Sequence, residues 1–476
     1  MKILEQLLPM LSGGRVVGAL GGPIERVHTD TRSLQAGDLF VALKGDSFDA
    51  NQFLHQAKAA GAVGAIAHQG LAEAGLGGVE VPDTLAALGQ LAQQWRRQWT
   101  GPLIAVTGSN GKTTVTQMVA SILRAAVGER ALATQGNFNN HIGVPLTLLR
   151  LRETHELAVV ELGMNHPGEI AYIAGLAQPT VALVNNAQRE HQEFMATVEA
   201  VAVENGQVIG ALPDDGVAVF PSDDAHTPVW RDLAGARCCL TFSDTDPSAD
   251  VVATGADWIE GAWQVGVRTP QGSFECRLHI AGRHNVRNAL AATACALAAG
   301  VPQDRIAAGL TQFEPVGGRS RAIEIVGSQG HLTLVDDSYN ANPDSVIAAI
   351  HVLAELPGPR RLVLGDMGEV GDQGLAFHLE VLRHAMGCGI ERLDVAGDWM
   401  TQAVAVLQTE APAQLLCLWS DVDALAADVC AQSADFRSVL VKGSRFMRME
   451  RVVKALQSTA QGQTLHNTTK DASHVA

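Results

Sequence analysis

The sequence lacks the long apolar runs and the export signal that would place it in or beyond a membrane. Its longest apolar stretch, Ala289–Val301, is shorter than the ~20 residues that a membrane-spanning helix needs. Residues 1–11 are rich in leucine, but Glu5 and Gln6 interrupt the run and the apolar positions keep helical spacing. This pattern is typical of an amphipathic helix and not of a signal peptide. We therefore expect a cytoplasmic protein without a transmembrane segment.

Paired cysteines and an excess of positive charge are also absent. The seven cysteines form no CxxC pair and show no metal-finger spacing, which predicts reduced, mostly buried thiols. The net charge of −16 argues against nucleic acid as a partner, because such binding needs basic surface to neutralise phosphates. It does not argue against nucleotide binding, since one positive pocket is enough for a triphosphate.

The elements that are present fall into three blocks along a chain of 476 residues, which is longer than one hydrophobic core usually supports. The first block ends in a helix at 83–99, followed by the Gly101-Pro102 pair that marks a boundary. In both later blocks, apolar strands alternate with helices, which favours parallel α/β sheets. Strands are predicted at 103–106, 157–161, 181–184, 332–335, 361–364 and 438–441, and helices at 114–126, 285–299, 344–356 and 378–386.

A glycine-rich loop lies between the strand at 103–106 and the following helix. Its glycines let backbone N–H groups approach phosphate oxygens without a Cβ in the way. Lys112 supplies a positive charge for the β and γ phosphates, and the Thr113 hydroxyl is a ligand for Mg²⁺. Val106 stands where the first glycine of the general P-loop motif belongs, so the flanking strand and helix carry the interpretation against a simple turn with an exposed lysine. The predicted phosphate site is Gly108-Ser109-Asn110-Gly111-Lys112-Thr113-Thr114.

Two further residues are candidates for the metal. Glu161 ends a buried strand next to the loop, where a carboxylate is well placed to bind Mg²⁺. The alternative is a solvated strand end, which the neighbouring P-loop makes the weaker interpretation. His191 follows the strand at 181–184 and is a further candidate ligand. A solvated loop histidine explains His191 equally well.

The expected architecture is α/β with three domains. A small N-terminal α/β domain covers residues 1–99, and a central P-loop domain with a mixed or parallel sheet covers residues 100–318. A C-terminal Rossmann-like α/β domain covers residues 319–457. After about residue 457 the composition becomes polar and unpatterned, so we expect residues 458–476 to form a disordered tail.

Several motifs, taken in order, resemble the Mur ligase family over roughly residues 25–455. The P-loop is similar to the shortened loop of that family, and so are Gly136–Asn140, Ile142–Pro145, Glu161–Gly163 and His284–Asn288. Further motifs resemble the branch that joins D-alanyl-D-alanine to a UDP-N-acetylmuramoyl-tripeptide: Thr29–Arg32, Gly37–Gly45, Asp337–Pro343, Leu364–Glu369 and Val441–Arg445.

This resemblance implies an ATP- and Mg²⁺-dependent peptide-bond-forming ligase of peptidoglycan precursor synthesis, acting as a monomer. The first domain would bind the UDP-sugar substrate, the second ATP, and the third the dipeptide while closing on ATP. By the family pattern, Asn285 and Asn288 would contact the adenine side. Arg319 would reach the phosphates and Asp337 the ribose, although a solvated hinge arginine is the alternative for Arg319. Lys112, Glu161, His191 and Arg319 form the expected catalytic set.

One segment departs from the family pattern. Many relatives carry a carbamylated lysine between the Mg²⁺ ions, in a helix after the histidine that matches His191. Here the corresponding position holds Asn205, and no lysine occurs between Lys112 and Lys442. Either Glu204 or Glu190 supplies a carboxylate in its place, or one metal is held mainly by Glu161 and His191.

The sequence leaves two other functions open. One is a folylpolyglutamate synthase or another Mur ligase with a different amino acid. The other is a P-loop ATPase that acts as a conformational switch and hydrolyses ATP without an amine acceptor.

Overall fold

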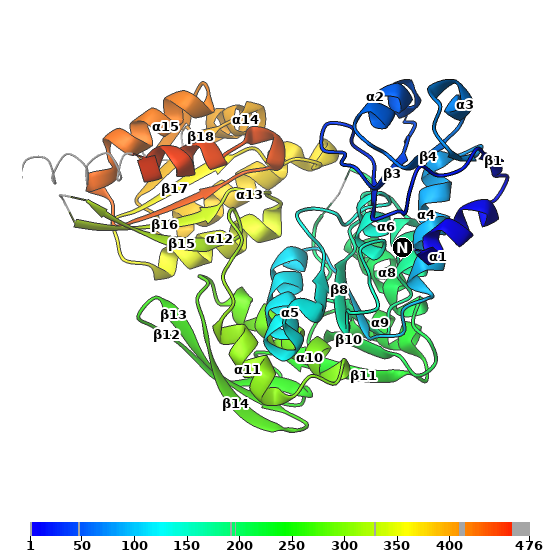
Figure 1. Cartoon of the computed structure of the whole chain (residues 1–476). Helices are drawn as coiled ribbons and strands as arrows, with labels where there is room; N and C mark the ends of the chain where they lie inside the picture. Colours follow the sequence, from blue (N-terminus) through cyan, green and yellow to red (C-terminus); the bar gives the residue numbers. More distant parts are fainter. Residues whose placement is uncertain are drawn as a thin grey trace, which may run out of the picture.

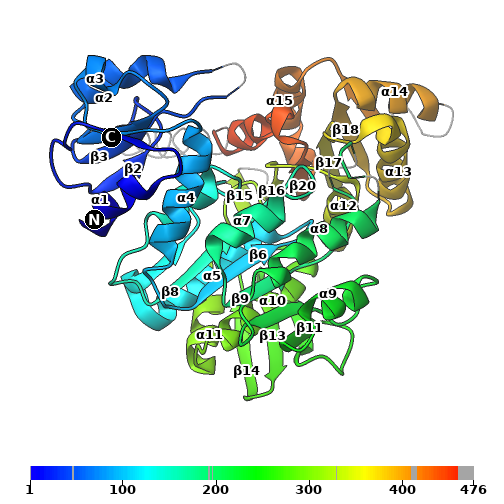
Figure 2. The ribbon, with the colours of Figure 1, turned by 90° about the vertical axis from the view of Figure 1, so that its right-hand side faces the viewer.

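The computed structural model describes residues 2–45, 48–190, 193–195, 197–327, 330–408 and 415–458. These residues form three sheets, each with its own helices, so the predicted three-domain α/β class is confirmed (Figure 1). In Figure 2 the N-terminal and C-terminal domains lie above the central domain, one on either side. His191 and residues 459–476 of the expected tail lie outside the described residues. Within the described ranges, no helix has both the length and the apolar composition to cross a membrane.

The N-terminal domain is built on a five-stranded sheet with the order β1-β5-β4-β3-β2. β1 runs antiparallel to β5, and the other neighbours are parallel. Its strands are β1 (Arg15–Val17), β2 (Arg26–His28), β3 (Asp38–Val41), β4 (Gly64–Ala67) and β5 (Gly78–Glu80), and its helices are α1 (Lys2–Leu7), α2 (Leu54–Ala59), α3 (Leu71–Ala74) and α4 (Thr84–Arg96).

Helix α4 attaches this first domain to the central one. Its apolar residues belong to a core that includes strands and helices of the central domain. The Arg96 guanidinium donates to the carbonyl oxygens of Ala177 at 2.8 Å and Gln178 at 2.9 Å. The indole of Trp95 donates to the carbonyl oxygen of Leu151 at 3.1 Å. The helix predicted at 83–99 is thus confirmed, three residues shorter at its C-terminal end.

The central domain has a nine-stranded sheet with the order β14-β13-β12-β11-β10-β9-β6-β8-β7. From β7 at one edge to β12, all neighbouring strands are parallel. At the other edge, β12, β13 and β14 are antiparallel, so the sheet is mixed. Its strands are β6 (Leu103–Thr107), β7 (Ala131–Ala133), β8 (Leu157–Glu161), β9 (Val181–Val184), β10 (Val217–Pro221), β11 (Cys238–Ser243), β12 (Val251–Ile259), β13 (Ala262–Thr269) and β14 (Gly272–Leu278). Its helices are α5 (Lys112–Val127), α6 (Gly143–Leu148), α7 (Glu169–Ala177), α8 (Val198–Gly210), α9 (Thr227–Ala234), α10 (His284–Ala298) and α11 (Gln303–Thr311).

Both faces of the central sheet are covered. Successive side chains of a strand point to opposite faces. Leu103 and Ala105 therefore pack with α6, α7 and α8, whereas Ile104 and Val106 pack with α5, α10 and α11. Because β6, β8 and β9 are parallel neighbours, their carboxyl ends meet at one edge of the sheet, which is where such folds bind ligands.

The C-terminal domain has a six-stranded sheet with the order β15-β16-β20-β17-β18-β19. β15 and β16 form an antiparallel hairpin at one edge, and the remaining pairs are parallel. Helices on both faces cover this sheet, as a Rossmann-like domain requires. The elements are β15 (Arg321–Gly327), β16 (Gly330–Asp337), β17 (Arg360–Gly365), β18 (Arg392–Ala396), β19 (Leu416–Trp419), β20 (Ser438–Lys442), α12 (Pro343–Glu355), α13 (Gly374–Gly387), α14 (Asp398–Leu407) and α15 (Val422–Ala431).

Candidate active site

The predicted phosphate loop occupies the turn between β6 and α5. Gly111 immediately precedes α5 with a φ of +79°, a conformation that L side chains rarely adopt. A Cβ on Gly111 would lie 2.6 Å from Asn288 Oδ1 and 2.8 Å from Asn185 Nδ2. Only glycine fits this close approach. The loop backbone therefore leads straight into the N-terminal end of α5, whose N–H groups and positive dipole end favour an anion.

Lys112 is held at the inner side of this loop. Its ammonium donates to the carbonyl oxygens of Gly108 and Ser109, the latter at 3.0 Å, and pairs with Glu190 Oε2 at 3.1 Å. The side chain of Lys112 is 16% exposed and that of Glu190 is 6% exposed. The structure thus places a cation in the loop, as the sequence predicts, and adds a buried carboxylate next to it.

Glu161 and Thr113 form a second polar group beside the loop. Thr113 Oγ1 donates to Glu161 Oε1 at 3.1 Å, and Asn139 Nδ2 donates to the same oxygen at 2.8 Å. Glu161 is 3% exposed at the carboxyl end of β8, and its N–H donates to Thr134 Oγ1. A buried carboxylate next to a hydroxyl offers the hard oxygen atoms that Mg²⁺ prefers, so these two residues fit a magnesium site.

Asn205 lies under the loop, on α8. Its Oδ1 accepts from the N–H of Gly108 at 2.9 Å, and its Nδ2 donates to Glu190 Oε1 at 3.3 Å. Its backbone oxygen also accepts from Thr107 Oγ1. Asn205 therefore joins the loop to Glu190. Glu204 accepts from the N–H of Ile170 at 2.9 Å, at the start of α7, so its contact is with that helix.

A row of amides after β9 supports the loop from the other side, and its residues were not among the site residues predicted from the sequence. Asn186 Oδ1 accepts from the N–H of Asn110 at 2.9 Å, and Gln188 Oε1 accepts from the Asn110 side chain at 2.6 Å. Asn185 Nδ2 donates to the carbonyl oxygen of Asn110 at 2.8 Å. The signal was available, because polar residues that directly follow a buried strand beside a P-loop strand share its edge.

The same amides connect the loop to α10. Asn185 Nδ2 donates to Asn288 Oδ1 at 3.0 Å, and Asn288 Nδ2 donates to Asn285 Oδ1 at 2.9 Å. Both predicted adenine-side residues are buried, Asn285 at 1% and Asn288 at 6% exposure. The structure thus brings Asn288 against the loop and Asn285 one turn away. Their contact with adenine stays a prediction.

The C-terminal domain meets the loop through α12. Asn342 Nδ2 donates to Asn110 Oδ1 at 2.9 Å, while Asn342 also caps α12. Arg189, next to Glu190, pairs with Asp344 of α12 at 2.6 Å and with Glu380 of α13 at 2.8 Å. These contacts close two domains around the carboxyl edge of the central sheet.

Arg319 and Asp337, the two residues predicted to come from the C-terminal domain, lie near this junction. The Arg319 guanidinium stacks on the Tyr339 ring, 4.0 Å from its centroid. Asp337 accepts from Lys442 Nζ at 2.5 Å and from the N–H of Ser320 at 3.0 Å. The predicted contacts of Arg319 with phosphate and of Asp337 with ribose stay predictions. His191, the third predicted metal ligand, lies outside the described residues.

Comparison with known proteins identifies this arrangement of domains. Three family models match in order: "Mur ligase family, catalytic domain" over residues 23–96, "Mur ligase middle domain" over 106–296 and "Mur ligase, glutamate ligase domain" over 321–445. The chain is 40% identical to the UDP-N-acetylmuramoyl-tripeptide--D-alanyl-D-alanine ligase of Escherichia coli (strain K12), over 95% of this chain and 98% of that one. The chain belongs to the Mur ligase family.

Solved structures agree with the sequence matches over nearly the whole of this Mur ligase. A crystal structure of MurF from Acinetobacter baumannii is similar with a TM-score of 0.86 and 34% identity, covering 95% of this chain and 98% of that chain. The MurF ligase of Thermotoga maritima, solved in complex with ADP, is similar with a TM-score of 0.77 and 25% identity, covering 92% and 98%. The relative from Bacillus subtilis (strain 168) that carries the same ligase name as the E. coli protein is 32% identical over 93% of this Mur ligase and 96% of that chain.

Proposed function

We propose that this Mur ligase uses ATP to join D-alanyl-D-alanine to UDP-N-acetylmuramoyl-tripeptide in peptidoglycan precursor synthesis. The observation that carries the proposal is 40% identity over 95% of the chain to a ligase of that name, in all three domains. A switch ATPase would share the P-loop but would have no reason to share the first and third domains.

The chemistry follows from the charges at the loop. A peptide carboxylate is a poor acyl donor, because its leaving group would be oxide. Attack of a carboxylate oxygen on the γ-phosphorus of ATP forms an acyl phosphate and releases ADP. The dipeptide amine then attacks the acyl carbon, and phosphate leaves as the amide forms and the amine loses a proton. Lys112 offsets the negative charge that spreads over the transferring phosphoryl group.

The domains supply most of the remaining acceleration by holding three reactants in register. In this proposal the N-terminal domain binds the UDP-sugar end, the central domain ATP, and the C-terminal domain the dipeptide. The bonds from α12 and α13 to Asn110 and Arg189 support a closing movement of the C-terminal domain onto the nucleotide.

Mg²⁺ is the metal that the buried oxygen atoms of Thr113 and Glu161 fit best. When bound there, it would neutralise charge on the β and γ phosphates. Neither side chain needs to act as a nucleophile. Asn139 Nδ2 donates to Glu161 Oε1 at 2.8 Å, so the carboxylate is oriented before any ligand binds.

Glu190 takes the place of the carbamylated lysine of relatives in this proposal. Its buried carboxylate lies between Lys112 and Asn205, and Asn205 stands at the position of that lysine. A carboxylate and a carbamate both present hard anionic oxygens. Glu204, the other candidate, is engaged at the start of α7.

A phosphate-release assay tests the ligase activity. With ATP, Mg²⁺ and UDP-N-acetylmuramoyl-tripeptide, phosphate should be released at full rate only when D-alanyl-D-alanine is also present. Mass spectrometry of the same reaction should then detect UDP-N-acetylmuramoyl-pentapeptide. Full-rate ADP formation with neither UDP-N-acetylmuramoyl-tripeptide nor D-alanyl-D-alanine present would contradict the proposal and support the switch ATPase.

Binding of Mn²⁺, a paramagnetic substitute for Mg²⁺, tests the role of Glu190. In electron paramagnetic resonance titrations with ADP present, Glu190→Gln should bind Mn²⁺ at least about tenfold more weakly than the unchanged protein, whereas the matched Glu204→Gln should not. If Glu190→Gln bound Mn²⁺ with the same affinity as Glu204→Gln and the unchanged protein, Glu190 would not be a metal ligand.

A further inference from the structure

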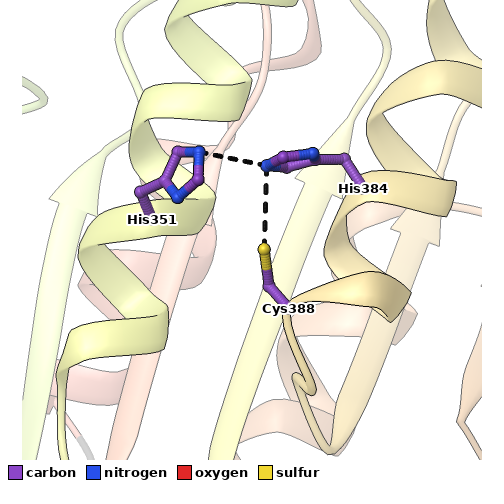
Figure 3. A group of neighbouring side chains, drawn as sticks. All are labelled: His351, His384 and Cys388. Atoms are coloured by element: carbon purple, nitrogen blue, oxygen red, sulfur yellow. Dashed lines mark hydrogen bonds between the residues drawn. The ribbon is translucent and has the colours of Figure 1, made fainter.

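Three potential metal ligands meet on the surface of the C-terminal domain, away from the phosphate loop. His351 lies on α12, His384 lies on α13, and Cys388 is the residue that follows α13. His384 and Cys388 are four residues apart, so the helical repeat places them on one face, toward α12. Figure 3 shows the two imidazoles and the thiol pointing toward one another. Within the described residues, no other group of three or more His, Cys, Asp or Glu side chains is placed to share a metal ion.

Two of the three distances between the donor atoms are close to those around one metal ion. His384 Nε2 lies 3.1 Å from His351 Nε2 and 3.6 Å from Cys388 Sγ, and all three atoms lie within 4.8 Å of one another. Around a tetrahedral zinc ion, with Zn–N of about 2.0–2.1 Å and Zn–S of about 2.3 Å, neighbouring donor atoms are about 3.3–3.6 Å apart. Each side chain offers a single atom to the shared centre.

We propose that His351, His384 and Cys388 form a binding site for one Zn²⁺ ion. Two imidazoles and a thiolate are borderline-soft ligands, which select zinc over Mg²⁺. Three protein ligands leave the fourth tetrahedral position to water, and His351 is exposed, so the ion can enter from solvent. The site is separate from the Mg²⁺ site at Thr113 and Glu161 and does not depend on the ligase activity.

The position of the site gives the ion a structural effect. His351 lies seven residues, about two helical turns, after Asp344 on α12, and His384 lies one turn after Glu380 on α13. Asp344 and Glu380 are the two residues that hold Arg189 of the central domain. An ion shared by His351 and His384 therefore fixes the spacing of the two helices that receive Arg189.

Titration with Co²⁺, a spectroscopic substitute for Zn²⁺, tests the site directly. The unchanged protein should bind one Co²⁺ with the charge-transfer absorption of a cobalt–thiolate bond, and Zn²⁺ but not Mg²⁺ should remove the absorption. Cys388→Ser and His384→Ala should lose the band, and exposed His351→Ala should weaken binding at least about tenfold.

Two variants with similar side chains serve as controls. Cys430→Ser and His279→Ala remove another thiol and another histidine outside the site and should leave the titration unchanged. A missing band in the unchanged protein, or a band that persists in Cys388→Ser, would overturn the proposal. If circular dichroism shows that Cys388→Ser does not fold, the His351→Ala variant decides. An unchanged Co²⁺ affinity in folded His351→Ala would also overturn the proposal.

Hydrogen exchange gives a second measurement. Zn²⁺ should slow amide exchange in α12 and α13 of the unchanged protein, because binding to the native state alone stabilises it. The same addition should leave exchange in these helices unchanged in the His351→Ala variant. Equal slowing in both proteins would place the zinc elsewhere and contradict the proposal.

Discussion

Lys112 and Glu190 form the charged pair around which the phosphate loop is built. The lysine is tied to two loop carbonyl oxygens and to a carboxylate that is itself bonded to Asn205. A triphosphate that enters the loop would offer this ammonium stronger anionic partners than the carbonyl oxygens. The pair therefore holds the side chain close to its working position before ATP arrives.

Replacing Lys112 by alanine should abolish the first chemical step and leave the fold intact. The loss of the only cation that the sequence places in the loop motif should lower kcat at least about 100-fold, since it acts on charge that develops during phosphoryl transfer. Acyl-phosphate formation can be followed by borohydride trapping of the tripeptide. A control measurement of UDP-substrate binding, which we propose takes place on the N-terminal domain, should change little. Retained ligation by a folded Lys112→Ala protein would refute this role.

Asp223 carries a charge whose contribution to stability depends on pH. It pairs with Arg287 of α10, the helix that also carries Asn285 and Asn288. Burial opposes ionisation of Asp223, but hydrogen bonds from Arg287, Thr245 and Ser243 outweigh it and lower its pKa to about 2.

Because this folded-state pKa lies below the unfolded value of ~3.9, the pair stabilises the native state above about pH 4. That contribution is lost as the pH falls toward 2. The difference in Tm between the unchanged protein and Asp223→Asn should therefore shrink between pH 5 and pH 2.5. Arg287→Met should reduce the dependence of Tm on pH in the same direction but less completely, because the bonds from Thr245 and Ser243 to Asp223 remain. A difference in Tm that stays constant over this range would contradict the assignment.

The positions of single residues were predictable from the sequence where they depend on the residue's own segment. Gly111, Lys112 and Thr113 are defined by a local motif, and Glu161 by its place at the end of a strand. The contacts of Asn205, Asn185 and Glu190 were not predictable, because each joins segments far apart in the chain, although Glu190 itself was named as a candidate carboxylate. The replacement of a lysine by Asn205 was visible, but its bond to Gly108 was not.

At the scale of elements, the sequence predicted several of the buried strands and helices but missed the equally buried β10 and β18. β8 and β9 have the predicted bounds, and α10 is shifted by one residue. The antiparallel edge formed by β12, β13 and β14 was not predicted. β13 alternates buried and exposed positions, and β12 and β14 are exposed at many of theirs, so the apolar signal of these strands is weaker.

Asn342 shows how one helix end serves both fold and site. Its Oδ1 accepts from the N–H of Ser345 to cap α12, and its Nδ2 donates to Asn110 in the loop. Asn342→Ser should keep the cap and lose the bond to Asn110, whereas Asn342→Ala should lose both. We expect a rise in KM for ATP in both variants, and an additional loss of about 0.5–2 kcal/mol of stability in the alanine variant alone.

Calorimetry and steady-state kinetics measure the two effects separately. Equal Tm values for Asn342→Ser and Asn342→Ala would show that the cap contributes nothing. An unchanged KM in both would show that the bond to Asn110 does not help to form the nucleotide site.

At the scale of the whole molecule, the central and C-terminal domains meet at the phosphate loop, although each has its own sheet. The order of the domains was predictable from motifs along the chain, whereas the contacts between them were not. Nothing in the residues around Arg189 indicates that its partners lie more than 150 positions later, at Asp344 and Glu380. Such contacts depend on how the folded domains dock, which is a property of complete surfaces and not of segments.

Arg189 is the residue through which this docking can be tested. Its guanidinium pairs with Asp344 at 2.6 Å and Glu380 at 2.8 Å, and hydrogen bonds to these carboxylates raise its pKa. Arg189→Met keeps an apolar side chain of similar length but removes the charge, together with the guanidinium that lies 5.4 Å from the centroid of the Phe377 ring. The C-terminal domain should then open more often, because a bidentate, charge-assisted contact is lost. The radius of gyration from X-ray scattering should rise and kcat/KM should fall about tenfold.

Salt separates this effect from a local one. Arg189 and its partners are partly exposed, so added salt should weaken the contact in the unchanged protein and raise its radius of gyration. Arg189→Met should respond much less, because its contact is already lost. Arg451→Met, which breaks an exposed ion pair with Asp423 inside the C-terminal domain, should behave like the unchanged protein. If Arg189→Met kept the compact radius at low salt, the ion pairs would not be what holds the domains together, and other contacts such as the bond from Asn342 to Asn110 would have to maintain the closure.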